Sequence, residues 1–297
     1  MITPLLADGS LDIASVEKMI EHFISGGVHG VFILGTTGEF SGLSYDVRRE
    51  LIVETCNRVA GRLPILVGIT DVSLEESISL AAFAASAGAY AVVVAPPFYM
   101  NIDQQELYVY YEKLADAISI PMYLYNMPSH TKLSIDFDTV IKLATHERII
   151  GLKDSSGNGV YFQALCHAFR DQEEFMLMVG PEEMMAETVL MGSHGGVSGG
   201  SNLYPKLYVA LYNAAVARDF EKIKTYQACV MEISLSIYQV GGYKSSYMKG
   251  LKTAMSFAGL CQAAFAPPLY AFSDKEVEEL RKRVEKIEGM LKKNELF

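Results

Sequence analysis

Short apolar segments alternate with amphipathic segments along the first two thirds of the chain. Seven of the apolar segments are expected to be strands, and they span residues 31–34, 65–69, 91–94, 122–125, 149–152, 176–179 and 195–198. The segments between them have helical spacing, as in residues 13–23, where Ile13, Val16, Ile20 and Phe23 fall on one face. One strand and one helix recur every 25 to 30 residues or so, which predicts a parallel sheet with helical connections.

This repeat favours an α/β fold of the (β/α)8 TIM barrel type. Residues 1–4 would be a short remnant of the first strand, so whether the N-terminus is complete stays open. The competing architecture is a doubly wound open sheet, which usually carries a glycine-rich phosphate loop after its first strand. Gly35-Thr36-Thr37-Gly38-Glu39 follows a strand but matches neither G-x-G-x-x-G nor the P-loop, so the barrel is preferred.

The last 80 residues have a different pattern. Helical periodicity covers residues 220–238, 245–259 and 273–293, without further strand patterns. Capping-box sequences mark two helix starts, at Ser73–Glu76 in the first part of the chain and at Ser273–Glu276 here. No glycine- or proline-rich linker separates this part. We therefore expect a barrel over residues 1–217 and a helical extension, residues 218–297, packed on it.

Composition narrows the class of protein. A chain of 297 residues that is 50% hydrophobic supports a sizeable core. With 25 basic and 35 acidic residues the net charge is −10, and no basic cluster stands out, so nucleic acid is not an expected partner. No apolar run is long enough to cross a bilayer and no signal peptide is evident, which predicts a soluble cytoplasmic protein without a membrane partner. Cys56, Cys166, Cys229 and Cys261 lack C-x-x-C spacing, which favours buried free thiols.

Lys153 is the most unusual residue of the predicted sheet, because it ends the strand-like segment 148–153. Burying an ammonium is costly, and proteins often respond by lowering its pKa, which makes the neutral amine available. A neutral amine can attack a ketone and form an imine, which then serves as an electron sink. Alternatively, the side chain reaches solvent at the strand end and pairs with Asp154. This segment alone leaves both interpretations open.

Two other strand ends carry polar side chains. In Gly35–Glu39, small residues let a ligand approach the backbone, while two hydroxyls and successive amides can hold a carboxylate. Tyr125-Asn126-Met127-Pro128 places a phenol one strand away from Lys153, where it could relay protons, although ordinary packing of the ring is the alternative. In a barrel, these strand ends lie on the face that carries active sites.

Together, the motifs Gly35–Glu39, Tyr125–Pro128 and Gly151-Leu152-Lys153-Asp154 resemble those of the dihydrodipicolinate synthase/N-acetylneuraminate lyase family of class I Schiff-base aldolases. The resemblance covers nearly the whole chain, with 89 residues from Thr36 to Tyr125 and 28 from Tyr125 to Lys153. It implies that Lys153 attacks the ketone of pyruvate or of another 2-oxo acid. It also implies that Tyr125 shuttles protons during imine formation and carbon–carbon chemistry.

The resemblance implies further roles. Thr37 and the amides of the Thr36–Thr37 turn would grip the pyruvate carboxylate. Tyr99 matches a tyrosine that relatives lend to a neighbouring subunit, where Thr36 links it to Tyr125, so a homotetramer built as a dimer of dimers is expected. The backbone carbonyl of Val197 would lie near the substrate. Because the lysine imine is itself the electron sink, no metal and no organic cofactor are expected.

Two positions bear on the substrate. His130 stands where dihydrodipicolinate synthases carry an arginine for the carboxylate of aspartate semialdehyde, and an imidazole is a poor substitute for a bidentate guanidinium. A loop histidine that faces solvent is the alternative reading. Glu182, in Gly180-Pro181-Glu182-Glu183, occupies the place where sialic-acid lyases bind sugar hydroxyls, but acidic residues here would also favour a helix N-terminus.

The sialate-lyase pattern is incomplete, since Thr36 replaces its usual serine and Gly199 stands where a hydroxyl residue would help bind the sugar. These departures favour an aldolase or lyase that acts on pyruvate and a 2-keto-3-deoxy sugar acid, or a related dehydratase. A 4-hydroxy-tetrahydrodipicolinate synthase and an N-acetylneuraminate lyase remain alternatives. A non-catalytic sugar-acid binding protein is an alternative of another class.

Overall fold

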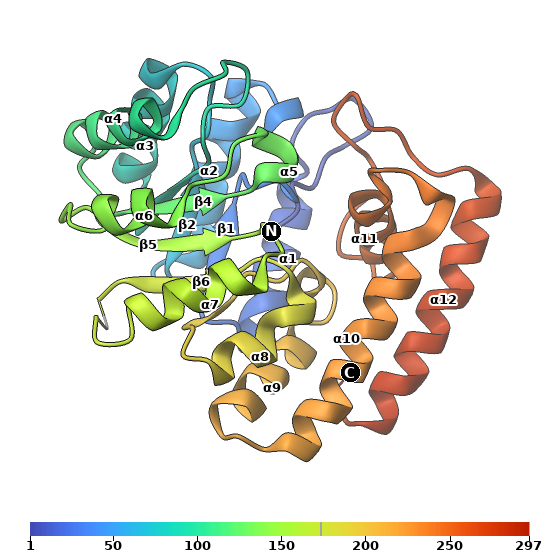
Figure 1. Ribbon diagram of the computed structural model, residues 1–297. Coiled ribbons are helices and arrows are strands. Elements are labelled where there is room, and N and C mark those ends of the chain that lie inside the picture. Colours follow the sequence, from blue (N-terminus) through green and yellow to red (C-terminus); the bar gives the residue numbers. More distant parts are fainter. Residues whose placement is uncertain (173, 297) are drawn as a thin grey trace. The chain divides into compact units, whose positions relative to one another are not determined.

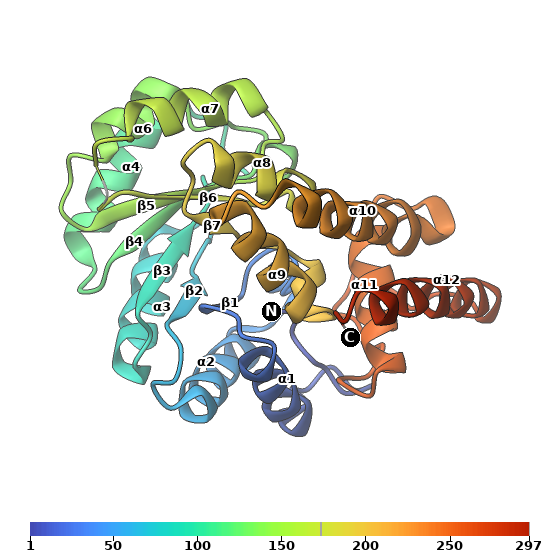
Figure 2. The same cartoon turned by 90° about the horizontal axis from the view of Figure 1, so that it is seen from below.

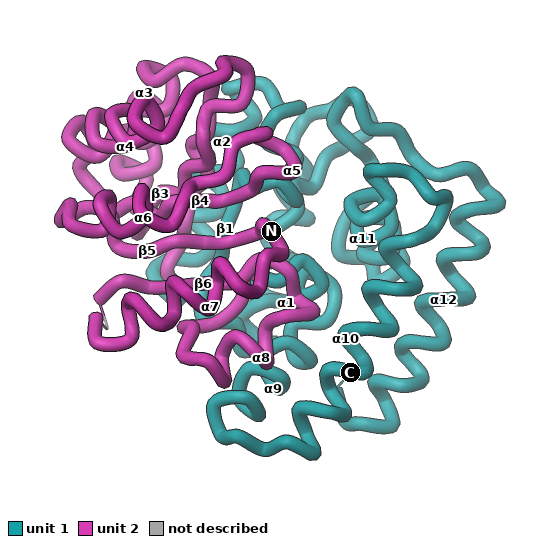
Figure 3. The backbone as a smooth tube through the Cα atoms, in the orientation of Figure 1, with its two compact units in different colours: residues 1–63, 198–297 teal, residues 64–197 magenta. Residues whose placement is uncertain are grey.

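The computed structural model describes residues 1–172 and 174–296 of the chain. It divides into two compact units, which Figure 3 shows in different colours. The first unit consists of residues 1–63 and 198–297, and the second of residues 64–197. Each unit is described in its own frame below.

The second unit is built on a parallel sheet (Figure 1). Its strands are β2 (Ile65–Gly68), β3 (Ala91–Val94), β4 (Met122–Asn126), β5 (Ile149–Asp154), β6 (Met176–Val179) and β7 (Gly195–Gly196). Each strand pairs in parallel with the next one along the chain. Every residue of β3 and β4 is buried, which is typical of a parallel sheet covered on both faces. The alternation of apolar and amphipathic segments thus predicted these strands correctly.

Helices connect the strands of this unit. They are α3 (Leu74–Ala87), α4 (Gln104–Ala117), α5 (Pro128–Thr131), α6 (Phe137–Leu143), α7 (Gly159–Ala168), the 3-10 helix η2 (Glu182–Met184) and α8 (Met185–Leu190). Figure 2 shows α4, α6 and α7 along the outer side of β4, β5 and β6. The Ser73 hydroxyl accepts a hydrogen bond from the Glu76 amide at 3.3 Å, so α3 begins where the capping pattern predicted.

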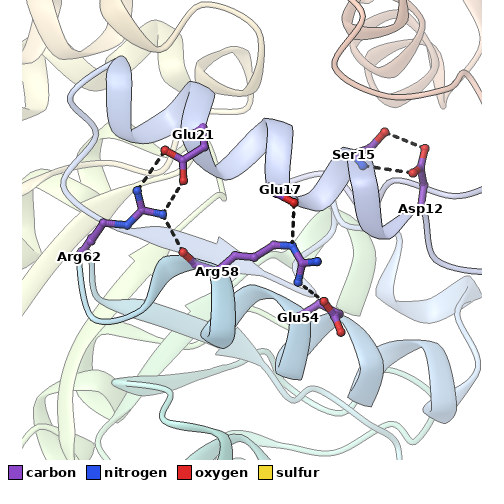
Figure 4. Close-up of polar contacts among 7 residues, drawn as sticks. All are labelled: Asp12, Ser15, Glu17, Glu21, Glu54, Arg58 and Arg62. Atoms are coloured by element: carbon purple, nitrogen blue, oxygen red, sulfur yellow. Dashed lines mark hydrogen bonds and ion pairs between the residues drawn. The ribbon is translucent and has the colours of Figure 1, made fainter.

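The N-terminal part of the first unit contains α1 (Ile13–Ser25), β1 (Val31–Ile33), the 3-10 helix η1 (Phe40–Gly42) and α2 (Tyr45–Val59). In α1, Val16, Ile20 and Phe23 are buried as expected, but Ile13 is 37% exposed because it begins the helix. Figure 4 shows the polar contacts between α1 and the region of α2. Arg62 binds both carboxylate oxygens of Glu21, and Arg58 binds Glu54 and lies 3.8 Å from Glu17. The Arg62–Glu21 contact is exposed and therefore contributes little to stability.

Residues 1–4 do not form the predicted first strand. The Met1 amine donates to the Phe32 carbonyl of β1, but no ladder of hydrogen bonds follows. The Ile2 amide donates to Asn202 Oδ1 at 2.9 Å, and the Thr3 hydroxyl donates to the Gly38 carbonyl at 2.6 Å. Pro4 has no amide hydrogen to offer to a sheet. The segment is nevertheless buried at Ile2 and Thr3.

The C-terminal part of the first unit is helical, as predicted. It contains the 3-10 helix η3 (Gly200–Asn202), α9 (Pro205–Val216), α10 (Phe220–Ser236), the 3-10 segment η4 (Ile237–Gly242), α11 (Ser246–Phe257) and α12 (Asp274–Lys293). The helices α10, α11 and α12 lie side by side (Figures 1 and 2). The α10 helix ends two residues before the end of the predicted range, because the chain continues from Ile237 as the 3-10 segment η4.

A buried lysine joins α11 to the segment before α12. Lys249 is 1% exposed, and among the described residues its ammonium has no hydrogen-bond partner. Its Nζ atom lies 3.9 Å, 4.2 Å and 4.5 Å from the ring centroids of Tyr243, Tyr270 and Phe272. Burial lowers the pKa of Lys249, and the nearby charge of Glu276 opposes that shift. Three aromatic faces thus take the place of hydrogen-bond acceptors around this cation.

The cysteines are free thiols, as expected. Three of the four are buried, and Cys56 is half-buried. Within residues 1–172 and 174–296, none of the helices combines the length and the apolar character that crossing a membrane requires.

The capping box of α12 leads to a stability prediction. The Ser273 side chain accepts from the Glu276 amide, and the Ser273 amide donates to the Glu276 carboxylate at 2.7 Å. Ser273→Ala removes the first of these bonds and should lower the free energy of unfolding by about 1 kcal/mol. Ser273→Thr retains the hydroxyl and serves as the control. Urea unfolding followed by circular dichroism at one protein concentration measures both, and equal midpoints for wild type and the alanine variant would contradict the prediction.

Candidate active site

Tyr125 and Lys153 lie next to each other at the carboxyl ends of β4 and β5. The register of the two parallel strands sets Tyr125 opposite Lys153. The Nζ atom of Lys153 is 4.2 Å from the centroid of the Tyr125 ring. Both side chains are buried, at 8% and 5% exposure. The structure therefore brings together the two strand-end residues that the sequence singled out, and Lys153 does not extend into solvent.

Asp154 points away from Lys153, because consecutive side chains of a strand alternate between its faces. Its Oδ1 atom accepts from Asn126 Nδ2 at 2.8 Å and from the Ser156 amide at 3.2 Å. Its Oδ2 atom accepts from the Ser156 hydroxyl at 2.9 Å. The alternative interpretation, in which Lys153 reaches solvent and pairs with Asp154, is therefore wrong. The Lys153 side chain lies against the Tyr125 ring instead.

The Asn126–Asp154 bond fastens the ends of the two strands. These residues are also opposite each other in the register, one position beyond the Tyr125–Lys153 pair. The second amide atom of Asn126, Oδ1, accepts from the Ile135 amide at 3.0 Å. Burial raises the pKa of Asp154, while its hydrogen bonds from Ser156 and Asn126 act in the opposite direction. A buried polar pair with this many partners fixes the strand register on which the Tyr125–Lys153 contact depends.

Close packing at position 151 explains why a glycine stands two residues before Lys153. A Cβ atom at this position would lie 2.3 Å from the Met176 carbonyl oxygen and 2.6 Å from the Tyr123 ring. No larger residue fits without moving β6 or the ring. The glycine thus allows the close packing around β5 that places Lys153.

The Gly35–Glu39 turn belongs to the first unit. The Gly38 amide donates to the Gly35 carbonyl, and the Glu39 amide donates to the Thr36 carbonyl, both at 3.0 Å. Leu34 and Glu39, which flank the turn, each have a φ of 57°, a left-handed conformation that costs energy in residues other than glycine. Thr36 and Thr37 are half-buried at the tip. The turn is therefore tight.

Side chains of α11 contact this turn, and the sequence analysis did not find them. The Tyr247 hydroxyl lies 3.1 Å from Thr37 Oγ1. Lys252 Nζ donates to Glu39 Oε1 at 2.7 Å, and Glu39 Oε2 accepts from the Ala266 amide at 2.8 Å. A carboxylate among small residues directly after a strand signals that a buried partner is needed. The sequence gives no indication of which of its lysines supplies it.

The remaining predicted residues lie in the second unit. Tyr99 follows β3 and is 84% exposed. The Val197 amide donates to the Val179 carbonyl at 2.8 Å, which continues the pairing of β7 with β6. Glu182 is buried and is the first residue of η2.

His130 lies in the short helix α5 and is exposed. Its Nδ1 atom is 3.0 Å from the Ser129 hydroxyl. Partial desolvation, followed by the positive charge of Lys132, lowers the pKa of His130 below its ordinary value. This shift favours the uncharged imidazole, whereas the resemblance places a charged arginine at this position in dihydrodipicolinate synthases.

Metal-binding side chains do not gather in the described parts of the chain. Across residues 1–172 and 174–296, no group of three or more His, Cys, Asp and Glu residues is arranged to hold a metal ion.

Comparison with known proteins gives consistent matches over most of the chain. The sequence model described as the dihydrodipicolinate synthetase family matches residues 1–287. A 4-hydroxy-tetrahydrodipicolinate synthase of Azoarcus sp. (strain BH72) is 35% identical over 229 residues, which is 77% of each chain.

Solved structures give the same result. A dihydrodipicolinate synthase from Bacteroides thetaiotaomicron superimposes with a TM-score of 0.94 and 49% identity over 96% of each chain. YagE, a prophage protein of the dihydrodipicolinic acid synthase family from E. coli K12 solved with pyruvate, has a TM-score of 0.91 and 28% identity, covering 97% of this chain and 96% of its own. These similarities confirm the predicted TIM barrel fold with its helical content.

The Asn126–Asp154 bond can be tested through stability. Asn126→Ala removes the partner of a buried carboxylate and of the Ile135 amide, and should lower the free energy of unfolding by about 1–3 kcal/mol. Asn294→Ala is a matched control, since its amide donates to the Met290 carbonyl at the end of α12, away from the two strands. Urea unfolding of both variants provides the comparison. A loss no larger than that of the control would show that Asp154 does not depend on Asn126.

Proposed function

Because the chain belongs to the dihydrodipicolinate synthetase family, we propose that Lys153 is the imine-forming lysine of a lyase that acts on pyruvate and a second carbonyl compound. The chain is an enzyme of the class I, Schiff-base lyase type to which this family belongs. The observation that carries the assignment of Lys153 is its buried amine, 4.2 Å from the centroid of the Tyr125 ring at the ends of two neighbouring strands.

The proposed reaction begins with attack of the Lys153 amine on C2 of pyruvate. The carbinolamine loses water and becomes a protonated imine, whose positive nitrogen accepts electron density from the neighbouring carbon. Loss of a proton from C3 gives an enamine, which adds to the carbonyl carbon of the second substrate. Water then releases the product and restores the lysine. Read in reverse, the same steps cleave a longer 2-oxo acid into pyruvate and an aldehyde.

Tyr125 is proposed to move the protons of these steps. The Tyr125 side chain lies beside the Lys153 amine at the strand end. Its phenol is therefore suited to protonate the departing hydroxyl of the carbinolamine and, in a later step, the aldehyde oxygen. Thr36 would connect Tyr125 to Tyr99 of a neighbouring subunit. The high exposure of Tyr99 supports a partner surface at this position, and we propose a homotetramer built as a dimer of dimers.

The substrate carboxylate is assigned to Thr37 and to the amides of the Thr36–Thr37 turn, with the Val197 carbonyl near the bound ketone. Pyruvate as substrate is supported by two relatives whose structures were solved with it, YagE and a dihydrodipicolinate synthase from Acinetobacter baumannii.

The division into a barrel, residues 1–217, and an extension, residues 218–297, remains part of this proposal. So does a cytoplasmic location.

For the second substrate we propose a 2-keto-3-deoxy sugar acid. A neutral His130 cannot form the charge-assisted, bidentate contact with a carboxylate that an arginine forms. It can exchange hydrogen bonds with hydroxyl groups. Glu182 offers a buried carboxylate, which accepts from hydroxyl donors. Both features suit a polyhydroxylated substrate.

A 4-hydroxy-tetrahydrodipicolinate synthase is the second candidate. The specific observation in its favour is that relatives 35% and 49% identical to this chain carry the names of that synthase. The two candidates share the pyruvate imine and differ in the groups that hold the second substrate, so they are separated by the substrate that turns over.

Imine formation is tested by trapping. Incubation with pyruvate and borohydride should add one reduced pyruvyl group, which peptide mapping locates on Lys153. Lys153→Ala should abolish the adduct and turnover, because no other group supplies the imine nitrogen. Lys282→Ala, which changes a lysine of α12 with a 72% exposed side chain, is the control and should react as wild type does. A folded wild-type protein without an adduct, with pyruvate and with larger 2-oxo acids, would favour a non-catalytic sugar-acid binder.

The second substrate is tested with His130→Arg. Wild type should cleave 2-keto-3-deoxy sugar acids in preference to condensing pyruvate with aspartate semialdehyde. The arginine variant should raise kcat/KM for aspartate semialdehyde by roughly 10-fold or more, because a charged hydrogen bond to its carboxylate becomes available. His130→Gln, which stays neutral, should not. Efficient condensation by the wild-type enzyme would instead identify it as the synthase.

A further inference from the structure

Helix α11 of the C-terminal part contacts the Gly35–Glu39 turn through two side chains. The Tyr247 hydroxyl is 3.1 Å from Thr37 Oγ1, and the Lys252 ammonium is 2.7 Å from Glu39 Oε1. The turn and α11 both belong to the first unit (Figure 3). Tyr247 therefore contacts the tip of the turn and Lys252 contacts its end. In the proposed function this turn binds the substrate carboxylate.

The position of the Tyr247 hydroxyl is set by its surroundings. The Tyr247 ring packs edge to face against Tyr238, with the centroids 4.7 Å apart. At Gly199, a Cβ atom would lie 1.6 Å from the Tyr247 hydroxyl oxygen. The phenol therefore occupies the space that a side chain at position 199 would take. The glycine, which directly precedes η3, thus makes room for a hydroxyl that comes from α11.

The Lys252–Glu39 pair fixes the end of the turn. Both side chains are almost fully buried, at 1% and 4% exposure. Burial lowers the pKa of Lys252, and the Glu39 carboxylate opposes that shift. The second oxygen of Glu39 accepts from the Ala266 amide. A buried pair of this kind contributes little net stability, but losing one partner is costly, so it favours a single arrangement of the groups around it.

We infer that Tyr247 is a positioning residue that orients the Thr37 hydroxyl toward the substrate carboxylate, on a turn whose end is fixed by Lys252 and Glu39. The inference rests on the proposed function, which gives Thr37 that role. A threonine hydroxyl can rotate, and its hydrogen goes to the best acceptor available. When the Tyr247 phenol donates to Thr37 Oγ1, the Thr37 hydrogen is left to point at the carboxylate, and the two bonds strengthen each other.

The test is Tyr247→Phe, which retains the ring beside Tyr238 and removes the hydroxyl. The measurement is borohydride trapping on Lys153 at increasing concentrations of pyruvate, and in parallel of acetone, which has the ketone without the carboxylate. The pyruvate concentration that gives half of the maximal trapping rate should rise about 3- to 10-fold, which corresponds to the loss of one hydrogen bond. The maximal rate, and the concentration dependence for acetone, should stay as in wild type.

The matched control is Tyr212→Phe, which removes a phenol hydroxyl elsewhere in the same unit, where the ring packs against His29. It should leave both ketones unaffected. An unchanged pyruvate dependence in Tyr247→Phe would overturn the inference, and so would an equal loss for pyruvate and acetone, since that indicates a general structural effect. Absence of any adduct in wild type would instead contradict the proposed function itself.

Discussion

The parallel register of β4 and β5 is the constraint on which the candidate chemistry depends. It sets Tyr125 opposite Lys153 and, one residue later, Asn126 opposite Asp154. Because side chains alternate along a strand, the first pair can face the site while the second pair turns away and bonds across the strands. A slip of one residue would reverse both faces. The buried Asn126–Asp154 bond resists such a slip, so a pair on the opposite face of the strands maintains the distance between the phenol and the amine.

Among residues 1–172 and 174–296, three lysines are buried, and the groups around each of them differ. Lys153 lies against the Tyr125 ring, Lys249 lies among three aromatic rings, and Lys252 pairs with Glu39. Burial by itself therefore does not identify a nucleophile. What separates Lys153 is its place at the carboxyl end of a barrel strand, beside a phenol. Lys249 and Lys252 belong to α11 and hold segments of the first unit together.

Local patterns predicted most of the elements, because apolar periodicity and capping residues act over a few positions. The strands from β2 to β6 match to within two residues, and Ser273 begins α12 as its capping box indicated. Residues 1–4 were wrongly expected to form a strand, because a short apolar segment does not reveal that its bonds will go to scattered partners, such as the Asn202 side chain and the Gly38 carbonyl. Tyr247 and Lys252 could not be predicted either. They contact residues more than 200 positions away, and a helical sequence does not specify which turn it will meet.

The contacts of α11 also change how the C-terminal residues are understood. A turn of small residues with two left-handed flanking positions has few interactions of its own to select one conformation. Its hydroxyls can rotate, and its carboxylate needs a buried partner. The compact first unit joins residues 1–63 with residues 198–297, so the helices that follow the strands supply what the turn lacks. If the turn binds the substrate carboxylate as proposed, the C-terminal helices contribute to that binding, since removing them would leave Glu39 without the Lys252 cation and Thr37 without the Tyr247 hydroxyl.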